Sequence, residues 1–121
     1  MALRSPQNQT GKIRENVLEY EIAQEQAAAL GRLGRALEAA LTSLAAYDEA
    51  AAVAENALER PRKDTRTALL EAAGYALWCF IIQREACGLR DQATVVRQYR
   101  VPAEVRNRMG VFPARCLRPK P

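Results

Sequence analysis

The stretch GYALWCFIIQREACG, residues 74–88, decides the fold of this 121-residue chain. It holds the only Trp of the sequence and one of its two Phe residues, beside two Ile and two of the three Cys. On a helical wheel its apolar side chains occupy nearly every face, and a helix that is apolar on nearly all sides is buried on nearly all sides. We therefore predict that this stretch forms the middle of a helical core.

The apolar residues of this segment fall on two faces. One face is predicted to pack against the preceding helix and consists of Leu69, Ala73, Ala76, Leu77, Phe80 and Ile81. The second is turned roughly half way round and consists of Tyr75, Trp78 and Ile82. Because a lone Trp beside Phe and Ile at helical spacing is usually packing, we expect Trp78 to be mostly buried and no cofactor to bind here.

A membrane span is the other structure that an apolar helix can form. The apolar run from Ala68 to Ile82 is short of the roughly 20 residues that a span requires, and it contains Glu71. We therefore expect no contact with a membrane.

A long amphipathic helix is predicted to precede this segment, beginning near Lys12. Its apolar stripe recurs at spacings of three, four or seven residues and comprises Leu18, Ile22, Ala29, Leu33, Leu37, Ala40, Leu44 and Tyr47. The spacing continues to Leu58, so helix is expected to about residue 60. Asp48 interrupts the stripe, and whether the helix bends or breaks there is left open.

The remaining elements are marked by turn and capping residues. Pro61 is expected to end the first helix, with Asp64 or Thr65 capping a second helix that runs to Cys87 and stops at Gly88. Two short helices should follow, one capped by Asp91 and ending at Tyr99, the other running from Pro102 to Gly110. The sequence thus predicts an all-α fold: a flexible arm (1–12), one helical domain (13–110) and a flexible basic tail (111–121).

The composition limits the function classes. Hydrophobic residues make up 49% and charged residues 26%, as in an ordinary globular protein. The net charge of +4 is concentrated at the C-terminal end, because residues 88–121 carry eight basic and two acidic side chains. Cys79, Cys87 and Cys116 form no metal or disulfide framework, and no apolar leader is present, so a reduced, cytoplasmic protein is expected.

Catalytic and metal-binding motifs are not found. The sequence has no His, which removes the commonest metal ligand and the side chain best suited to proton transfer at neutral pH. We therefore expect a protein that is not an enzyme and that holds no metal or cofactor. The carboxylates Glu21 and Glu25 are instead expected to meet Arg84 or Glu85 in a buried ion-pair network that fixes how the helices pair.

One stretch suggests nucleic-acid binding as an alternative. DQATVVRQYRVPAEVRNRMG, residues 91–110, predicts two short helices joined by a turn, which is weakly similar to a helix-turn-helix. Its arginines are Arg97, Arg100, Arg106 and Arg108. The motif favours Gly in the turn, where this chain has Arg100, so the interpretation as a capping element over the end of the bundle is preferred.

The chain resembles a known family in three segments. LEYEIAQEQAAALGRLGRAL (18–37), CFIIQREACGLRD (79–91) and YRVPAEVRNRMG (99–110) are similar to a family of small, uncharacterised, all-helical bacterial proteins, over roughly residues 15–110. The resemblance implies an all-helical fold and no assigned activity, so it contributes no site residues.

A homodimer is the function-related prediction that the sequence supports best. The first helix presents a stripe longer than the second can cover, and the second presents more apolar surface than the first can cover. A shared bundle that acts as an oligomerisation or protein-interaction module, with an unidentified protein partner as a further option, would satisfy both. The expected contact residues are Leu30, Leu33, Leu37, Leu41, Tyr75, Trp78 and Ile82, with Gly31, Gly34 and Gly74 allowing close approach.

Overall fold

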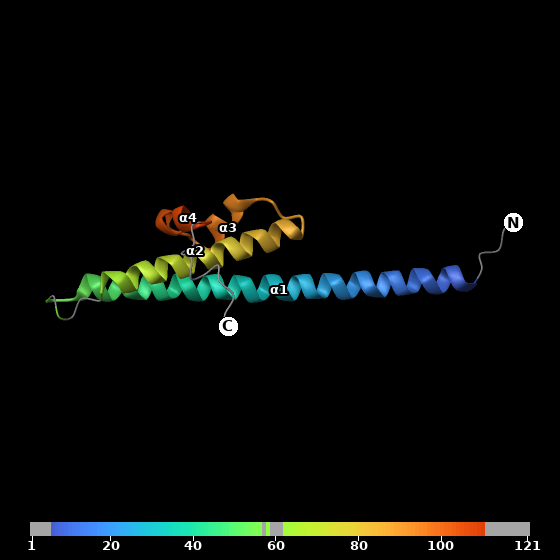
Figure 1. Cartoon of the computed structure of the whole chain (residues 1–121), viewed down its shortest axis with the longest axis horizontal. Helices are drawn as coiled ribbons and strands as arrows, with labels where there is room; N and C mark the ends of the chain where they lie inside the picture. Colours follow the sequence, from blue (N-terminus) through green and yellow to red (C-terminus); the bar gives the residue numbers. More distant parts are fainter. Residues whose placement is uncertain (1–5, 57, 59–61, 111–121) are drawn as a thin grey trace, which may run out of the picture.

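The computed structural model describes residues 6–56, 58 and 62–110, and these form an all-α fold without strands. Four helices follow one another along the chain (Figure 1): α1 (Pro6–Val53), α2 (Lys63–Ala86), α3 (Gln92–Gln98) and α4 (Ala103–Arg108). The predicted fold class, a long hairpin followed by two short helices, is confirmed. The predicted tail, 111–121, lies outside the described residues, as does Cys116.

Helix α1 differs from its predicted bounds at both ends. It begins at Pro6 rather than near Lys12, so much of the expected arm is helical; Pro is favoured in the first turn of a helix, where its missing N–H would have no partner. It passes Asp48 without a break and ends at Val53, short of residue 60. Beyond it, Asn56 Oδ1 accepts a hydrogen bond from the Leu58 N–H at 3.0 Å, a local turn that competes with helix.

Helix α2 runs back along the C-terminal half of α1. Its N-cap is Arg62, without a side-chain cap, so neither Asp64 nor Thr65 takes that role as expected; Asp64 lies in the first turn instead. The Tyr47 hydroxyl of α1 donates to the Arg62 carbonyl oxygen at 2.5 Å and ties the start of α2 to α1. At the other end Cys87 is the C-cap and Gly88 has a φ of 87°, the left-handed conformation predicted for it.

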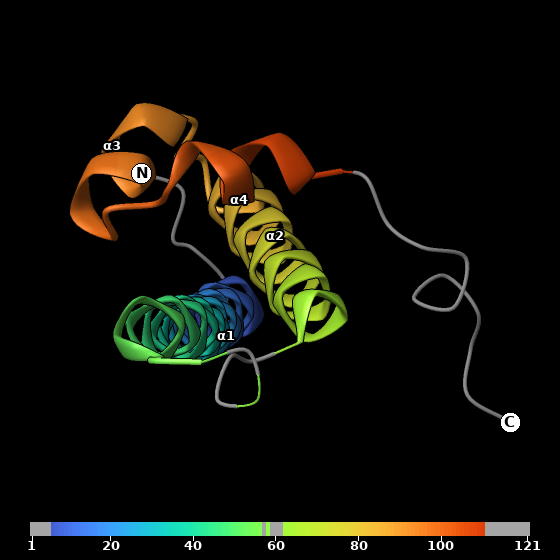
Figure 2. The same cartoon turned by 90° about the vertical axis from the view of Figure 1, so that its left-hand side faces the viewer.

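Helix α4 lies over α2, and α3 lies to one side of it (Figure 2). Asp91 caps α3 as predicted, accepting the Thr94 N–H at 3.3 Å. The chain then turns at Arg100, whose φ of 51° is left-handed, and Pro102 caps α4. We refer to residues 98–102 as the α3–α4 corner.

The core lies where all four helices meet. Leu37 of α1, Leu77 of α2, Val95 of α3 and Val105 of α4 are each fully buried. Tyr99 closes this core at the α3–α4 corner, with its ring edge-on to Phe80 at 5.4 Å between centroids. At 1.5 Å per residue, the 48 residues of α1 span about 72 Å and the 24 of α2 about 36 Å, so the core serves only the C-terminal half of α1.

Candidate interaction surfaces

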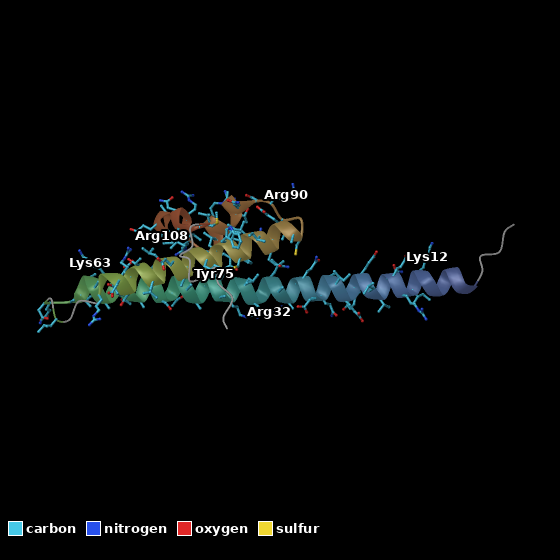
Figure 3. The ribbon with its side chains drawn as sticks, viewed as in Figure 1. Lys12, Arg32, Lys63, Tyr75, Arg90 and Arg108 are labelled. Carbon is cyan, nitrogen blue, oxygen red and sulfur yellow. The ribbon has the colours of Figure 1, made fainter. Side chains whose placement is uncertain are left out.

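The N-terminal half of α1, residues 11–29, is uncovered by any other described helix (Figure 1). Every residue in it is exposed or half-buried, and in Figure 3 the side chains between Lys12 and Arg32 project from α1 on both sides. It nonetheless carries five large apolar side chains, each between 49% and 64% exposed: Ile13, Val17, Leu18, Tyr20 and Ile22. This half of α1 therefore presents an apolar surface that no other described helix covers.

These residues belong to two different stripes. Leu18 and Ile22 continue the predicted stripe that faces α2 further along. Ile13, Val17 and Tyr20 start a second one, which we call the outer stripe; at 3.6 residues per turn it lies roughly half way round α1 from the core. Its members are Ile13, Val17, Tyr20, Gln24, Ala28, Gly31, Arg35, Ala39, Thr42 and Ala46.

The outer stripe was missed by the interpretation of the sequence, although its signal is there. Successive members stand three or four residues apart over more than 30 positions. Only three of them are large and apolar, and the others are small or polar, so the stripe is hard to distinguish from an ordinary solvated face. The structure makes it visible by showing that Ile13 and Tyr20 are each 64% exposed.

A groove of about 630 Å³ lies between α1 and the α3–α4 corner. Its apolar lining includes Leu41, Ala45 and Tyr99, and its polar lining includes Glu38 and Arg100. The remaining lining residues are Thr42, Leu44, Asp48, Gln98 and Pro102. Glu38 and Thr42 also lie at the edge of the outer stripe or within it, so the groove and the stripe form one continuous surface.

Arg66 fixes the groove by joining three helices. From α2 its Nε donates to Asp48 Oδ1 of α1 at 2.8 Å, and its Nη2 lies 2.8 Å from Glu104 Oε2 of α4. The hydrogen bond from Arg66 lowers the pKa of the Asp48 carboxyl, and these two carboxylates together raise the pKa of the Arg66 guanidinium. Asp48, which sequence reasoning treated as a site of disruption, is therefore a contact that orients α4 over α1.

Two glycines predicted to allow contact between copies serve contacts within the chain. A Cβ atom on Gly34 would lie 2.7 Å from the Tyr99 hydroxyl oxygen, and one on Gly74 would lie 2.9 Å from the Cβ of Arg108. Gly34 thus admits the α3–α4 corner, and Gly74 admits the end of α4. A Cβ on Gly31 would meet only the side chain of Arg35 at 3.2 Å, which leaves Gly31 available to a partner.

The predicted dimer contacts on α1 lie on its core face. Leu37 is fully buried within the chain, so it is unavailable to a second copy, contrary to expectation. Leu30, Leu33 and Leu41 are half-buried and pack against the core. These four leucines were assigned to contacts between copies because the apolar surface of α1 was expected to exceed what α2 can cover, but all four face the core of their own chain.

The second face of α2 remains partly exposed. Tyr75 is 45%, Trp78 36% and Ile82 42% exposed within the single chain, so Trp78 is less buried than expected. The short helices α3 and α4 thus leave all three of these side chains more than a third exposed. It is a second candidate surface for contacts between chains.

The predicted ion-pair network is not formed among the described residues. Glu25 pairs with Arg32 of its own helix at 3.0 Å, whereas the Arg84 guanidinium lies over the Phe80 ring, 5.7 Å from its centroid. Glu21 and Glu85 are exposed, and no charged side chain in the described part of the chain is buried. The expectation failed because α1 projects Glu21 and Glu25 beyond the end of α2.

The four arginines of the helix-turn-helix-like stretch are distributed over α3, α4 and the corner between them. Arg97, Arg100 and Arg106 are exposed and form no salt bridge within the described residues. Arg108 is half-buried and lies 3.9 Å from Glu71 of α2. The structure therefore brings three of the four to the surface, and one of them, Arg97, interacts electrostatically with Asp91.

The described part of the chain offers neither a metal site nor a membrane-spanning helix. No group of three or more Cys, Asp or Glu residues there has an arrangement that could hold a metal ion. Within the same residues no helix is long and apolar enough to cross a membrane. Cys79 and Cys87 are free thiols.

The fold and its surfaces define a small all-helical protein whose exposed features are helix faces and a groove. Residues 1–116 match a family of unknown function, DUF6665, and the chain belongs to this family. No curated protein and no solved structure matches the chain significantly. The predicted resemblance to an uncharacterised family is confirmed.

Proposed function

We propose that this chain is a non-enzymatic helical module that forms a homodimer through the outer stripe of α1. The observation that carries the proposal is the N-terminal half of α1, which extends beyond α2 with Ile13, Val17 and Tyr20 at least half exposed. Two-fold pairing is the commonest way for a soluble chain to cover such a surface.

The non-enzymatic part of the proposal is supported by the chemistry of the side chains that the chain offers. The sequence contains no His, and the polar lining of the groove offers Glu38 and Arg100 at its rim without a nucleophile paired to a base. The free thiols Cys79 and Cys87 suit a reducing compartment, so a cytoplasmic location belongs to the proposal. Such a dimer would act by holding two copies together and presenting them to a protein partner.

Light scattering of the wild-type chain and two matched variants tests the proposal. The wild type should have twice the chain mass of 13.4 kDa at micromolar concentration. Val17→Glu places a charge in the outer stripe and should shift the mass toward 13.4 kDa. Gln26→Glu makes the same change in charge on another face of the same helix half and should leave the mass unchanged. A wild-type monomer at these concentrations would rule the proposal out.

DNA binding is a second candidate, favoured by the exposed cations Arg97, Arg100 and Arg106. Against it, α4 has only six residues and its Val105 is used for the core, so little of this helix is left to enter a groove of DNA. Titration with duplex DNA at several salt concentrations tests this candidate, because binding through phosphates weakens steeply as salt rises. The absence of binding at low salt would remove this candidate.

A further inference from the structure

We propose that the second copy docks antiparallel, with the N-terminal half of its α1 lying along the outer stripe and the side chain of its Tyr20 entering the groove beside the α3–α4 corner. This inference rests on the proposed homodimer and adds the orientation of the partner and its binding site. It follows from the sizes and the charges of the residues along the outer stripe, and from the position of the groove.

The sizes of the side chains along the outer stripe favour an antiparallel pair. The large residues Ile13, Val17 and Tyr20 lie at one end, and the small residues Ala39, Thr42 and Ala46 lie at the other. A two-fold axis between Ala29 and Leu30 sets each large residue opposite a small one. The opposed pairs are Ile13 with Ala46, Val17 with Thr42, Tyr20 with Ala39, Gln24 with Arg35, and Ala28 with Gly31.

The centre of this pairing is suited to close approach of two helices. Ala28 and Gly31 meet there, and a Cβ on Gly31 would contact only the movable end of the Arg35 side chain. A parallel pair would instead set Tyr20 against Tyr20 and leave the small half of the stripe to face itself. That arrangement packs large against large and small against small, which leaves voids along half of the contact.

The charges along α1 also favour an antiparallel pair. Residues 15–25 carry four glutamates, whereas Lys12 and Arg14 precede them and Arg32 and Arg35 follow them. In the antiparallel pair, Glu21 and Glu25 of one copy come within about one helical turn of Arg35 and Arg32 of the other. A parallel pair would set Glu21 and Glu25 of one copy beside those of the second, and like charges repel.

The groove receives Tyr20 in this arrangement. Tyr20 is 64% exposed in the single chain, and its position opposite Ala39 places it next to Glu38 and Thr42, which line the groove. The phenol ring would lie against Leu41, Ala45 and Tyr99, while its hydroxyl would reach the polar rim at Glu38 and Arg100. A buried aromatic ring with a hydrogen-bonded polar end is typical of the residue that anchors an interface.

The contact is long enough for a stable dimer. From Ile13 to Ala46 the paired helices run side by side for about 50 Å. A strip about 10 Å wide on each copy amounts to about 1,000 Å² in total, which is the lower limit for a specific interface, before the two grooves are added.

Disulfide formation between copies tests the orientation directly. In a background of Cys79→Ser, Cys87→Ser and Cys116→Ser, three variants carry Val17→Cys, Thr42→Cys, or both. Under mild oxidation the double variant should form a covalent dimer in high yield, and neither single variant should do so. The masses of all three before oxidation come from light scattering.

The outcomes separate this inference from the proposed dimer. A covalent dimer of Val17→Cys alone would mean a parallel pair, and a dimeric mass without any cross-link would mean that another face is used; either overturns the antiparallel arrangement. A monomeric mass in the wild type overturns both proposals. Spin labels at residue 12 provide a second readout, because two labels should lie about 50 Å apart in the antiparallel pair and under about 20 Å apart in a parallel pair.

Discussion

Gly74 of α2 lies so close to the end of α4 that a Cβ atom on it would be 2.9 Å from the Cβ of Arg108 and 3.1 Å from the Arg108 carbonyl oxygen. The neighbouring atoms belong to a backbone and to the first atom of a side chain, so they cannot rotate away. Gly74 therefore sets the distance between α2 and α4.

Replacing Gly74 tests this contact. Gly74→Ala should lower the free energy of unfolding by about 1–3 kcal/mol, because α4 must shift away from α2. Gly11→Ala is the matched control: nothing lies within 4 Å of its added Cβ, and the greater helix propensity of Ala should raise stability by up to about 1 kcal/mol. Urea denaturation of both variants measures the difference. Equal free energies of unfolding for the two variants would show that the packing of α4 on α2 does not require a glycine at position 74.

A second prediction compares a buried leucine with an exposed one. Leu77 is 0% exposed at the centre of the core, and Leu58 is 98% exposed after the end of α1. Leu77→Ala should therefore reduce the free energy of unfolding by about 2–5 kcal/mol. Leu58→Ala should change it by less than about 0.5 kcal/mol. A comparable loss in both would mean that the core is not where the structure places it.

The sequence predicted the fold well because the core positions are marked by size and spacing. The large apolar residues Leu37 and Leu77, predicted to lie on the facing stripes of the two long helices, are fully buried, and Gly88 adopts the conformation that its type predicts. The predicted ends of α1 were wrong because the observed ends depend on weak local effects. These are a proline in the first turn and a hydrogen bond to the Asn56 side chain.

The candidate surfaces could be predicted only in part. Gly34 and Gly74 were correctly taken as points of close approach, but a spacing pattern does not say which element approaches, and both contacts lie within the chain. Asp48 was taken as a disruption because its partner Arg66 lies 18 positions away on another helix. The outer stripe was overlooked because its small residues look like an ordinary solvated face.

The stability should depend on pH through two carboxylates. Hydrogen bonds from Arg66 to Asp48, and from Thr94 to Asp91, lower the pKa of each carboxyl below its ordinary value of 3.8. A lowered pKa in the folded state stabilises the fold above about pH 4, and this contribution is lost as the pH falls through the lowered value. Melting temperature measured from pH 7 to pH 2 should therefore be level at first and then fall.

Removing the carboxylates isolates their share of this pH dependence. Asp48→Asn and Asp91→Asn should each melt lower than the wild type at pH 7, and the difference should shrink toward pH 2. A difference that stays constant over this range would mean that the ionised carboxylates contribute nothing to stability.

Charge reversal tests the pairing of the two α1 helices. Arg32→Glu with Arg35→Glu should weaken the dimer, because these residues would then face Glu21 and Glu25 of the other copy. Adding Glu21→Arg and Glu25→Arg to the same chain restores opposite charges between copies and should recover the affinity. Sedimentation at low salt measures the dissociation constant of the dimer for the double and the fourfold variant. If the fourfold variant associated no better than the double variant, these charges would not meet across the interface.

The central claim is that a second copy covers the N-terminal half of α1, and amide hydrogen exchange measured as a function of protein concentration tests it most directly. Helical amides that fray into water exchange quickly, and those in a packed helix exchange slowly. Protection of residues 11–29 should rise with concentration, in step with the dimeric mass, while residues 70–81 of α2 stay protected throughout. Protection of residues 11–29 that is the same at every concentration would contradict the account.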